Sequence, residues 1–428
     1  MTLLLTILAF GLMIFVHELG HFLMAKAWGV GIEQFSIGFG KPIAQFTSHN
    51  VQWRIGWIPL GGYVKMKGEN PDEQNIDDES ALSRKPWWQK AIIGFSGPFA
   101  NIVLTLILFI WSFMMPVYIE DQLPVVYKAE GKWAQVFAPG DSIISVNGKN
   151  IRGYSEFLQE LLSNPENTVL LSRNGNKQTV LISSSEVDSL AKSLYPYADT
   201  RIGEVVPKTP AYHSKLEPGD RIVAIDSLPV SNWYEMREII VNSEKDEVLL
   251  TIERNGQRFS KVLPLESSIN TGGNKAIGII QYQPVKYERR YKPLEAIQLG
   301  TVNTVNFIVL NYQALGKLVQ KPQDLTKSVG GPVMIASMSQ SFGKKGFGSL
   351  LFFFGSISLM LAIMNLLPIP VLDGGLILFA LIEGIIRKPV PQQVQSILQT
   401  IGFFILIFLM VLAFYSDIAS EVLRFMNR

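Results

Sequence analysis

Four long apolar segments limit what this chain can fold into more than any other feature of its sequence. They lie near residues 2–25, 91–116, 347–371 and 397–416. Each is close to or above the roughly 20 apolar residues with which a helix crosses a hydrocarbon core about 30 Å thick. Hydrophobic residues make up 48% of the chain and charged residues only 17%, whereas soluble domains carry about 25% charged residues. We therefore expect a polytopic α-helical protein with four transmembrane helices in a lipid bilayer.

Composition also excludes several other classes of function. The 38 Lys and Arg nearly balance the 36 Asp and Glu, so no basic surface for nucleic acid is indicated and we expect no nucleic-acid partner. The chain has no cysteine, which excludes disulfides, cysteine nucleophiles and thiolate metal sites.

Basic residues in the short loops predict how the chain crosses the membrane. The loop between the last two segments contains Arg387 and Lys388. The loop between the first two segments contains eight basic residues, namely Lys26, Lys41, Arg54, Lys65, Lys67, Arg84, Lys85 and Lys90. Because short cytoplasmic loops are enriched in Lys and Arg, we expect both loops to be cytoplasmic and the large 117–346 region to lie outside.

The outer region contains an internal repeat. Residues 138–148 match 217–227 around a shared Pro-Gly-Asp, and an Arg-Asn-Gly near 173–175 is echoed near 254–256. Each copy predicts a turn, a buried strand, a short helix, a second strand and a hairpin. The Pro-Gly-Asp-x-Ile strand is similar to that of PDZ domains, which bind extended peptides by adding a strand to a sheet edge. We expect two PDZ-like β-rich domains over residues 117–200 and 201–290, with short helices near 154–162 and 233–241.

The remaining segments complete the expected architecture. Residues 1–116 would contain the first two transmembrane helices, and 347–428 the last two. Residues 291–346 form an amphipathic outer region, because the segment 293–319 mixes apolar residues with Asn, Gln and Glu. Residues 51–57 alternate and residues 63–66 follow a Gly-Gly turn, so 51–66 is expected to form a small membrane-embedded hairpin whose edge pairs with substrate. An alternative is a cytosolic hairpin packed against the helices.

The sequence His17-Glu18-Leu19-Gly20-His21 carries the clearest chemistry. In a helix, positions i and i+4 lie on one face, where two imidazoles can hold one Zn²⁺. Glu18 lies beside the ligands and can accept a proton from water. Two packing histidines and a chance glutamate are the alternative. However, three ionisable groups within a lipid-embedded helix are costly, which favours function.

A third ligand is expected because catalytic zinc usually has three protein ligands and one open position. Asp373 is the one acid in the stretch 365–375, which ends the third apolar segment. An Asp-Gly-Gly turn closing a helix is the alternative. His17 would lie about 24 Å along a helix that enters from outside, in the cytoplasmic third, and the third segment would bring Asp373 to the same side.

Two amides within the apolar segments are further candidates. Asn365 precedes Asp373 by eight residues and could orient a substrate or hydrogen-bond its unwound backbone, although an interhelical hydrogen bond would explain it equally well. Asn101 follows Gly97-Pro98 and is expected to compensate the helix kink.

Together these residues resemble the site-2 protease family of intramembrane zinc metalloproteases. The HExxH in the first segment, the Leu-Asp-Gly in the third and the duplicated modules between them match that family. Four further stretches agree, namely Gly38-Phe39-Gly40 and residues 59–66, 96–101 and 328–332. One departure is Leu376, where relatives commonly have histidine; it puts a secondary polar contact in doubt, and not the metal site.

The resemblance implies a mechanism and a setting. His17, His21 and Asp373 would bind Zn²⁺, and Glu18 would act as general base. Asn365 and the hairpin residues Tyr63, Val64 and Lys65 would contact the substrate. Substrates would be single-span membrane proteins already cut on the outer side, such as an anti-sigma factor and remnant signal peptides. The protein would lie in a bacterial inner membrane, with its PDZ-like domains in the periplasm and its active site near the cytoplasmic side.

Two other classes of function remain as alternatives. A membrane-anchored PDZ adaptor without turnover would have no need of Glu18, which is intact. A metal carrier or sensor would need several ligand sets along a path, whereas the apolar segments show one compact set.

Overall fold

The computed structural model describes residues 2–69, 78–267, 273–320 and 331–426. The chain divides into two compact units. The helical unit comprises residues 1–117 and 290–416, and the β-rich unit comprises residues 118–289 and 417–428. Each unit is described separately below.

Seven helices account for most of the helical unit's described residues. They are α1 (Thr2–Ala27), α2 (Trp87–Met114), α7 (Pro293–Gln320), α9 (Pro332–Lys344), α10 (Phe347–Asn365), α11 (Asp373–Ile386) and α12 (Gln392–Met426). Within the part of the chain that the structure describes, four helical stretches are long and apolar enough to cross a membrane: Leu4–Ala27, Trp87–Met114, Phe347–Asn365 and Gln392–Ala419. All four coincide with the apolar segments that the sequence singles out.

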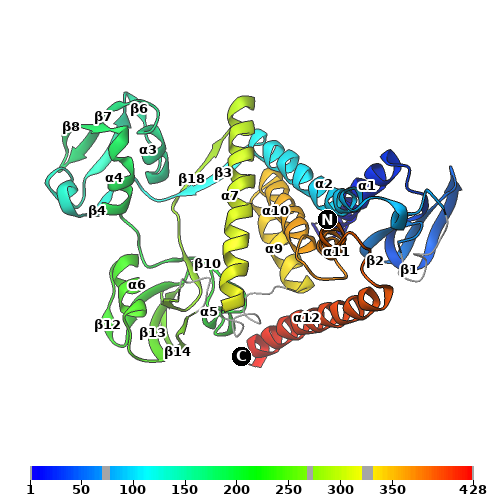
Figure 1. Ribbon diagram of the computed structural model, residues 1–428. Helices are drawn as coiled ribbons and strands as arrows, with labels where there is room; N and C mark the ends of the chain where they lie inside the picture. The colour runs from blue at the N-terminus through cyan, green and yellow to red at the C-terminus, as the bar shows by residue number, and fades with distance from the viewer. Residues whose placement is uncertain (1, 70–77, 268–272, 321–330, 427–428) are drawn as a thin grey trace. The chain divides into compact units, whose positions relative to one another are not determined.

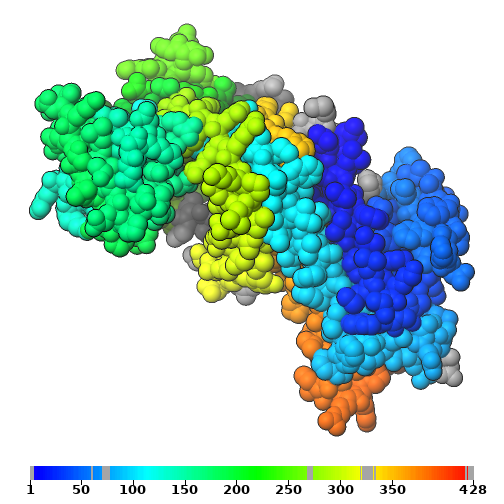
Figure 2. Space-filling model, turned by 90° about the horizontal axis from the view of Figure 1, so that it is seen from above, coloured from blue at the N-terminus to red at the C-terminus, as the bar shows by residue number. Residues whose placement is uncertain are grey.

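Helix α2 contacts α1, α7, α10 and α11. Figure 2 shows α2 in cyan between α1 in dark blue and α7 in yellow-green. Small residues allow these close approaches, since a Cβ atom at Gly20 of α1 would lie 2.9 Å from the Cβ of Ala100, and one at Gly355 of α10 would lie 2.8 Å from the ring of Phe109. Helices in lipid rely on such close van der Waals packing because no hydrophobic force draws them together.

The third apolar segment differs from the expectation. A helix over 347–371 is expected, but α10 ends at Asn365 and a new helix, α11, begins at Asp373. Pro368 and Pro370 lie in the connection, where each proline removes a backbone N–H donor and disfavours a continuous helix. Asp373 therefore starts a helix instead of closing one.

The loop after α1 forms a long antiparallel hairpin of β1 (Ile32–Ser48) and β2 (Val51–Met66). His49 and Asn50 form its two-residue turn with φ of 51° and 62°, as the type I′ turn requires. Both strands bend back on themselves and pair twice, so Phe35 lies opposite both Trp53 and Val64. The hairpin is therefore paired like a sheet of four short strands, with residues 62–66 at one edge.

The expected pairing within 51–66 is therefore wrong. Residues 51–57 and 63–66 do not pair with each other, because both halves of β2 pair with β1. Gly38, Gly40 and Gly61 have φ of 83°, 86° and 94°, a region open to glycine at little cost, and they bend the hairpin. The alternation pattern indicates β2 but does not show its partner.

The β-rich unit contains two four-stranded antiparallel sheets with the same order. The first is β6-β5-β7-β8 and the second is β12-β11-β13-β14. The strands of the first are β5 (Ser142–Val146), β6 (Lys149–Asn150), β7 (Glu166–Arg173) and β8 (Asn176–Ser183), and those of the second are β11 (Arg221–Ile225), β12 (Leu228–Pro229), β13 (Glu247–Arg254) and β14 (Gln257–Pro264). The expected short helices are α3 (Tyr154–Glu160) and α6 (Trp233–Val241). Figure 1 shows both modules in green.

The shared Pro-Gly-Asp motif makes the same contacts in both modules. Asp141 is fully buried and pairs with Arg173 at 2.7 Å, and Asp220 pairs with Arg254 at 2.6 Å. Each aspartate also accepts a hydrogen bond from a backbone N–H, of Ala138 in the first module at 2.8 Å and of Glu217 in the second at 2.9 Å. The sequence repeat is therefore a structural repeat.

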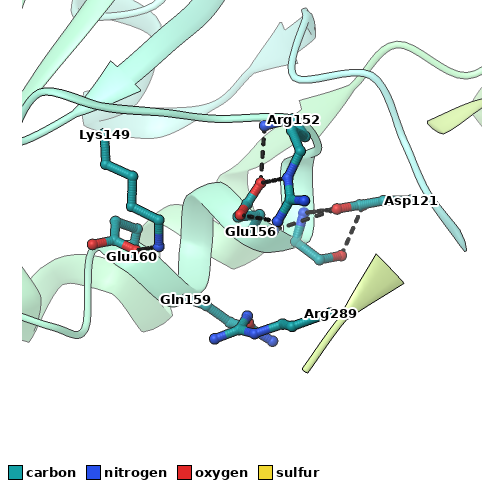
Figure 3. Close-up of polar contacts among 8 residues, drawn as sticks. Asp121, Lys149, Arg152, Glu156, Gln159, Glu160 and Arg289 are labelled. Atoms are coloured by element: carbon teal, nitrogen blue, oxygen red, sulfur yellow. Dashed lines mark hydrogen bonds and ion pairs between the residues drawn. The ribbon is translucent and has the colours of Figure 1, made fainter. Parts of the chain in front are cut away.

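Shorter pairings and helices complete the β-rich unit. The strand pairs are β3 (Val117–Asp121) with β18 (Val285–Arg289), β4 (Val126–Ala129) with β9 (Leu194–Pro196), β10 (Ile202–Val205) with β17 (Ile279–Gln281), and β15 (Glu266–Ser267) with β16 (Lys275–Ala276), and the remaining helices are α4 (Val187–Ser193) and α5 (Pro210–His213). Asp121 at the end of β3 caps α3, because its carboxylate accepts hydrogen bonds from the backbone N–H of Ser155 (Figure 3). Arg152 and Glu156 form an ion pair beside this cap (Figure 3).

Candidate active site

Three ligand-type side chains converge within the helical unit. His17 and His21 lie one turn apart on α1, and Asp373 is the first residue of α11. Nε2 of His17 lies 3.3 Å from Nε2 of His21 and 3.0 Å from Oδ2 of Asp373. Nε2 of His21 lies 3.2 Å from Oδ1 of Asp373. Two ligands at about 2.0–2.1 Å from a tetrahedral zinc lie roughly 3.3–3.4 Å apart, so these spacings fit zinc.

The hydrogen bond of His21 leaves its second ring nitrogen available to a metal ion. Its Nδ1 lies 2.7 Å from the carbonyl oxygen of Ile93. A carbonyl oxygen only accepts, so Nδ1 carries a proton, and Nε2 would present a lone pair in the neutral ring that a metal ligand must be. This nitrogen lies 3.2 Å from Oδ1 of Asp373, whose Oδ2 lies 3.0 Å from Nε2 of His17. Acceptor atoms that face one another in this way cannot hydrogen-bond to each other, whereas a metal ion between them can bind all of them.

Helix α2 leaves room for this arrangement at Gly97. A Cβ atom at position 97 would overlap Nε2 of His21 and lie 2.7 Å from its Cδ2 and Cε1 atoms. The imidazole therefore occupies the space that any other residue at position 97 would need. Both histidines are buried, with 7% and 6% of their surface exposed.

Glu18 is buried between α1 and the edge of the hairpin. A Cβ atom at Gly62 would lie 3.0 Å from Cγ of Glu18 and 2.8 Å from the side chain of Ile14, so β2 passes directly over the glutamate. The backbone N–H of Val64 faces the Glu18 carboxylate. The backbone N–H of Met66 likewise points away from β1 and donates to Glu69 at 3.0 Å. The edge of β2 thus presents backbone donors beside the glutamate.

A cavity of about 490 Å³ opens onto these groups. Its lining includes His17, Glu18, Asn101, Asn365 and Asp373. Phe39, Gly61 and Gly62 of the hairpin and the α1 residues Phe10 and Ile14 also line it. Nδ2 of Asn365 lies 3.3 Å from Nε2 of His17, so the expected amide is at the centre of the site.

The three hairpin residues expected to contact substrate lie beside the cavity lining. The Tyr63 hydroxyl lies 2.8 Å from the amide of Gln34, Val64 is buried, and Lys65 pairs with Glu33 at 2.7 Å. Their side chains thus have partners within the hairpin. Within β2 the lining is provided instead by Gly61 and Gly62, which the sequence indicates only as a turn because they have no side chain.

A smaller cavity of about 160 Å³ reaches Asp373 from another direction. Lys90 of α2 and Glu383 of α11 line it and form an ion pair, with Nζ 2.7 Å and 2.9 Å from the two carboxylate oxygens. Leu376, the departure from the family pattern, also lines this cavity. Val371, Leu372 and Asp373 line both cavities.

Asn101 does not compensate the kink at Pro98 as expected. Its side chain faces His17, with Nδ2 3.4 Å from Nδ1 of that ring. The expectation rested on sequence distance from the proline, which does not show which way a helical side chain points.

Comparison with known proteins identifies the family. The model of peptidase family M50 matches residues 5–409. This chain belongs to peptidase family M50, which includes the site-2 proteases. It is a metalloprotease of the intramembrane type, as the resemblance predicted.

Relatives match over nearly their whole length. The regulator of sigma-E protease, RseP, of Escherichia coli is 32% identical and is covered to 97%, over 96% of this chain. A candidate zinc metalloprotease of Borreliella burgdorferi is 31% identical, with 98% of both chains covered. The order of the HExxH segment, the repeated modules and the Leu-Asp-Gly segment suggests a resemblance to RseP, and this comparison confirms it. A solved PDZ domain of Listeria monocytogenes matches 20% of the chain with 23% identity and a TM-score of 0.18.

Proposed function

We propose that His17, His21 and Asp373 hold one Zn²⁺ and that Glu18 is the general base of a protease that cuts transmembrane segments. One observation carries this proposal: the ligand atoms of three side chains lie 3.0–3.3 Å apart, and two of these side chains, His17 and Asp373, line a cavity together with Glu18. When bound, zinc would polarise the scissile carbonyl and make water a stronger acid.

Glu18 provides the proton transfers. Glu18 lines the same cavity as His17 and Asp373, so its carboxylate can accept a proton from water there and return it to the leaving amine. General acid–base catalysis of this kind contributes about 10²–10⁴-fold in rate. The neighbouring Gly62 keeps Glu18 at the cavity wall, since the strand has no side chain to displace it.

The edge of β2 binds the unwound substrate. A transmembrane helix must lose its backbone hydrogen bonds before it can be cut, and its N–H and C=O groups then need partners. The backbone of Tyr63, Val64 and Lys65 offers such partners by strand addition, and Asn365 offers an amide. Helix-breaking residues near the cut site should therefore speed cleavage. Equal rates for substrates of different helicity would contradict this step.

The substrate class follows from the setting. The name of the Escherichia coli relative, regulator of sigma-E protease, supports a single-span anti-sigma factor as substrate, with remnant signal peptides as a second kind. Both would already be cut on the outer side. The repeated modules, over residues 117–200 and 201–290, are PDZ-like domains that exclude substrates with bulky outer parts.

The setting itself is a bacterial inner membrane that the chain crosses four times. The PDZ-like domains and the outer region of residues 291–346 lie in the periplasm; of this outer region, residues 321–330, which include Ser328, Val329 and Gly330, fall outside the described residues. The active site lies near the cytoplasmic side. The basic residues of the short loops support this orientation.

The test is cleavage of a tagged single-span peptide without an outer domain by the purified protein in lipid vesicles. We expect Glu18→Gln to lower the rate about 10²–10⁴-fold and a zinc chelator to abolish it. The matched control is Glu244→Gln, the same chemical change at an exposed residue, which should leave the rate unchanged. Undiminished cleavage by Glu18→Gln would overturn the role of Glu18. Binding without cleavage by wild type would favour a membrane-anchored PDZ adaptor instead.

A further inference from the structure

Asn101 of α2 has an unusual environment for a buried amide. Only 1% of its surface is exposed, and it lines the 490 Å³ cavity. Its Nδ2 lies 3.4 Å from Nδ1 of His17. Its Oδ1 is buried and has no hydrogen-bond partner within the described part of the chain. An unpaired buried acceptor is costly, so this amide needs an explanation.

The chemistry of the metal site resolves the orientation of this amide. If Nε2 of His17 binds a metal, the neutral ring carries its proton on Nδ1. An amide NH₂ cannot accept that proton, whereas the amide oxygen can. Because O and N of an amide differ only by a half-turn, rotating Asn101 places Oδ1 against Nδ1 and removes the unpaired acceptor at that contact.

We propose that Asn101 is a positioning residue for the metal site. Its Oδ1 accepts the Nδ1–H of His17, which fixes the tautomer and the ring angle so that Nε2 points at the metal. Asn101 thus does for His17 what the carbonyl of Ile93 does for His21, whose Nδ1 lies 2.7 Å from that oxygen. Metal-bound histidines generally donate their second N–H in this way. This inference rests on the proposed metal site.

The backbone around Asn101 is held as a positioning role requires. Its carbonyl oxygen accepts hydrogen bonds from the hydroxyl of Thr105 at 2.9 Å and from that of Ser358 on α10 at 3.0 Å. Thr105 also donates to the carbonyl of Gly355 at 3.0 Å. Two helices therefore fix the backbone from which the amide extends, and the side chain remains free to serve His17.

The experiment measures Co²⁺ binding by the metal-free, full-length protein in detergent, by competition with a chelator. Asn101→Leu keeps a similar shape without an acceptor, and we expect Co²⁺ affinity to fall about 10–100-fold. Asn101→Asp keeps an acceptor oxygen, and its affinity should equal or exceed that of wild type. The visible absorption band of bound Co²⁺, which reports ligand geometry, should change in Asn101→Leu and be restored in Asn101→Asp.

Asn150→Leu is the matched control. It makes the same chemical change at an exposed residue of β6, so affinity and spectrum should stay as in wild type. If Asn101→Leu does not fold, Asn101→Ser, whose hydroxyl is too short to reach His17, should show the same loss.

Three results would overturn the proposal. Wild-type affinity and spectrum in Asn101→Leu, or in Asn101→Ser where that variant replaces it, would show that the amide does not position His17. A loss in Asn101→Asp as large as in Asn101→Leu would point to a purely structural role. If wild type itself bound no Co²⁺, the proposed metal site would also be wrong. His17→Ala identifies that outcome, because it would then leave the measured Co²⁺ binding unchanged.

Discussion

The imidazole of His21 fills the space beside Gly97, where a Cβ atom would lie 2.7 Å from the Cδ2 and Cε1 atoms of the ring. Gly97→Ala should therefore push the ring out of line with Asp373 or force the two helices apart. Overpacking of this kind costs about 1–3 kcal/mol. We expect a loss of metal affinity and of proteolysis in parallel, measured by chelator competition and peptide cleavage.

Gly11→Ala provides the comparison for that experiment. Gly11 also lies on α1, but a Cβ atom there would meet nothing within 4 Å. This variant should retain both metal affinity and activity. If Gly97→Ala retained metal affinity and activity as Gly11→Ala does, then α1 and α2 would separate more easily than the contact suggests.

A second glycine separates catalysis from metal binding. A Cβ atom at Gly62 would meet Ile14, Ser36 and Cγ of Glu18, and none of the three metal ligands is among these nearest neighbours. Gly62→Ala should displace β2 or Glu18 and lower the cleavage rate by at least about tenfold, since general-base catalysis depends on position. Metal affinity should remain at the wild-type value. A parallel loss of both would show that the hairpin supports the ligands as well.

Much of this site follows from the sequence because spacing on a helix has a fixed geometric meaning. Histidines at i and i+4 share a face, and Nε2 of His17 lies 3.3 Å from Nε2 of His21 as that rule predicts. Asp373 is the one acid in its stretch, and it lies 3.0 Å from His17. The repeat predicts both sheets because its Asp and Arg residues make the same pair in each module.

Other features have no readable signal in the sequence. Helix α11 is not predicted because the apolar run continues past Asn365, and hydropathy does not show where a helix restarts. The double pairing of β1 depends on bends at Gly38 and Gly61, which only three-dimensional register reveals. Gly62 and Gly97 act through the absence of a Cβ atom, and such a role depends on which side chain lies opposite.

The ion pair between Lys90 and Glu383 connects α2 to α11, the helix that begins at Asp373. Only 10% and 22% of the two side chains are exposed. Because removing one partner leaves the other charge buried, Lys90→Met should destabilise the protein by about 3–5 kcal/mol. Thermal unfolding in detergent measures this change.

The double variant Lys90→Met, Glu383→Met tests whether the loss comes from the unpaired charge. A hydrophobic pair of similar size is often neutral or stabilising in place of a buried ion pair, so the double variant should regain most of the stability. If the two single losses simply add, the charges do not interact across the helices.

The last prediction concerns the pH dependence of the first module. Burial opposes ionisation of Asp141, but hydrogen bonds from Arg173 and from the backbone N–H of Ala138 outweigh it and hold the pKa of that carboxyl below its usual range. A carboxyl with a lower pKa in the folded state stabilises the fold above its unfolded value, near 3.9. That stabilisation is lost as pH falls through the folded value.

Asp141→Asn should therefore cost about 1–3 kcal/mol at pH 7 and progressively less below about pH 4, as measured by hydrogen exchange of β5 and β7 in the full chain. Asp188→Asn, at an exposed residue of the same module, should change stability by no more than about 0.5 kcal/mol at either pH. A cost for Asp141→Asn that is the same at pH 7 and below pH 4 would show that the carboxylate's charge does not stabilise this module.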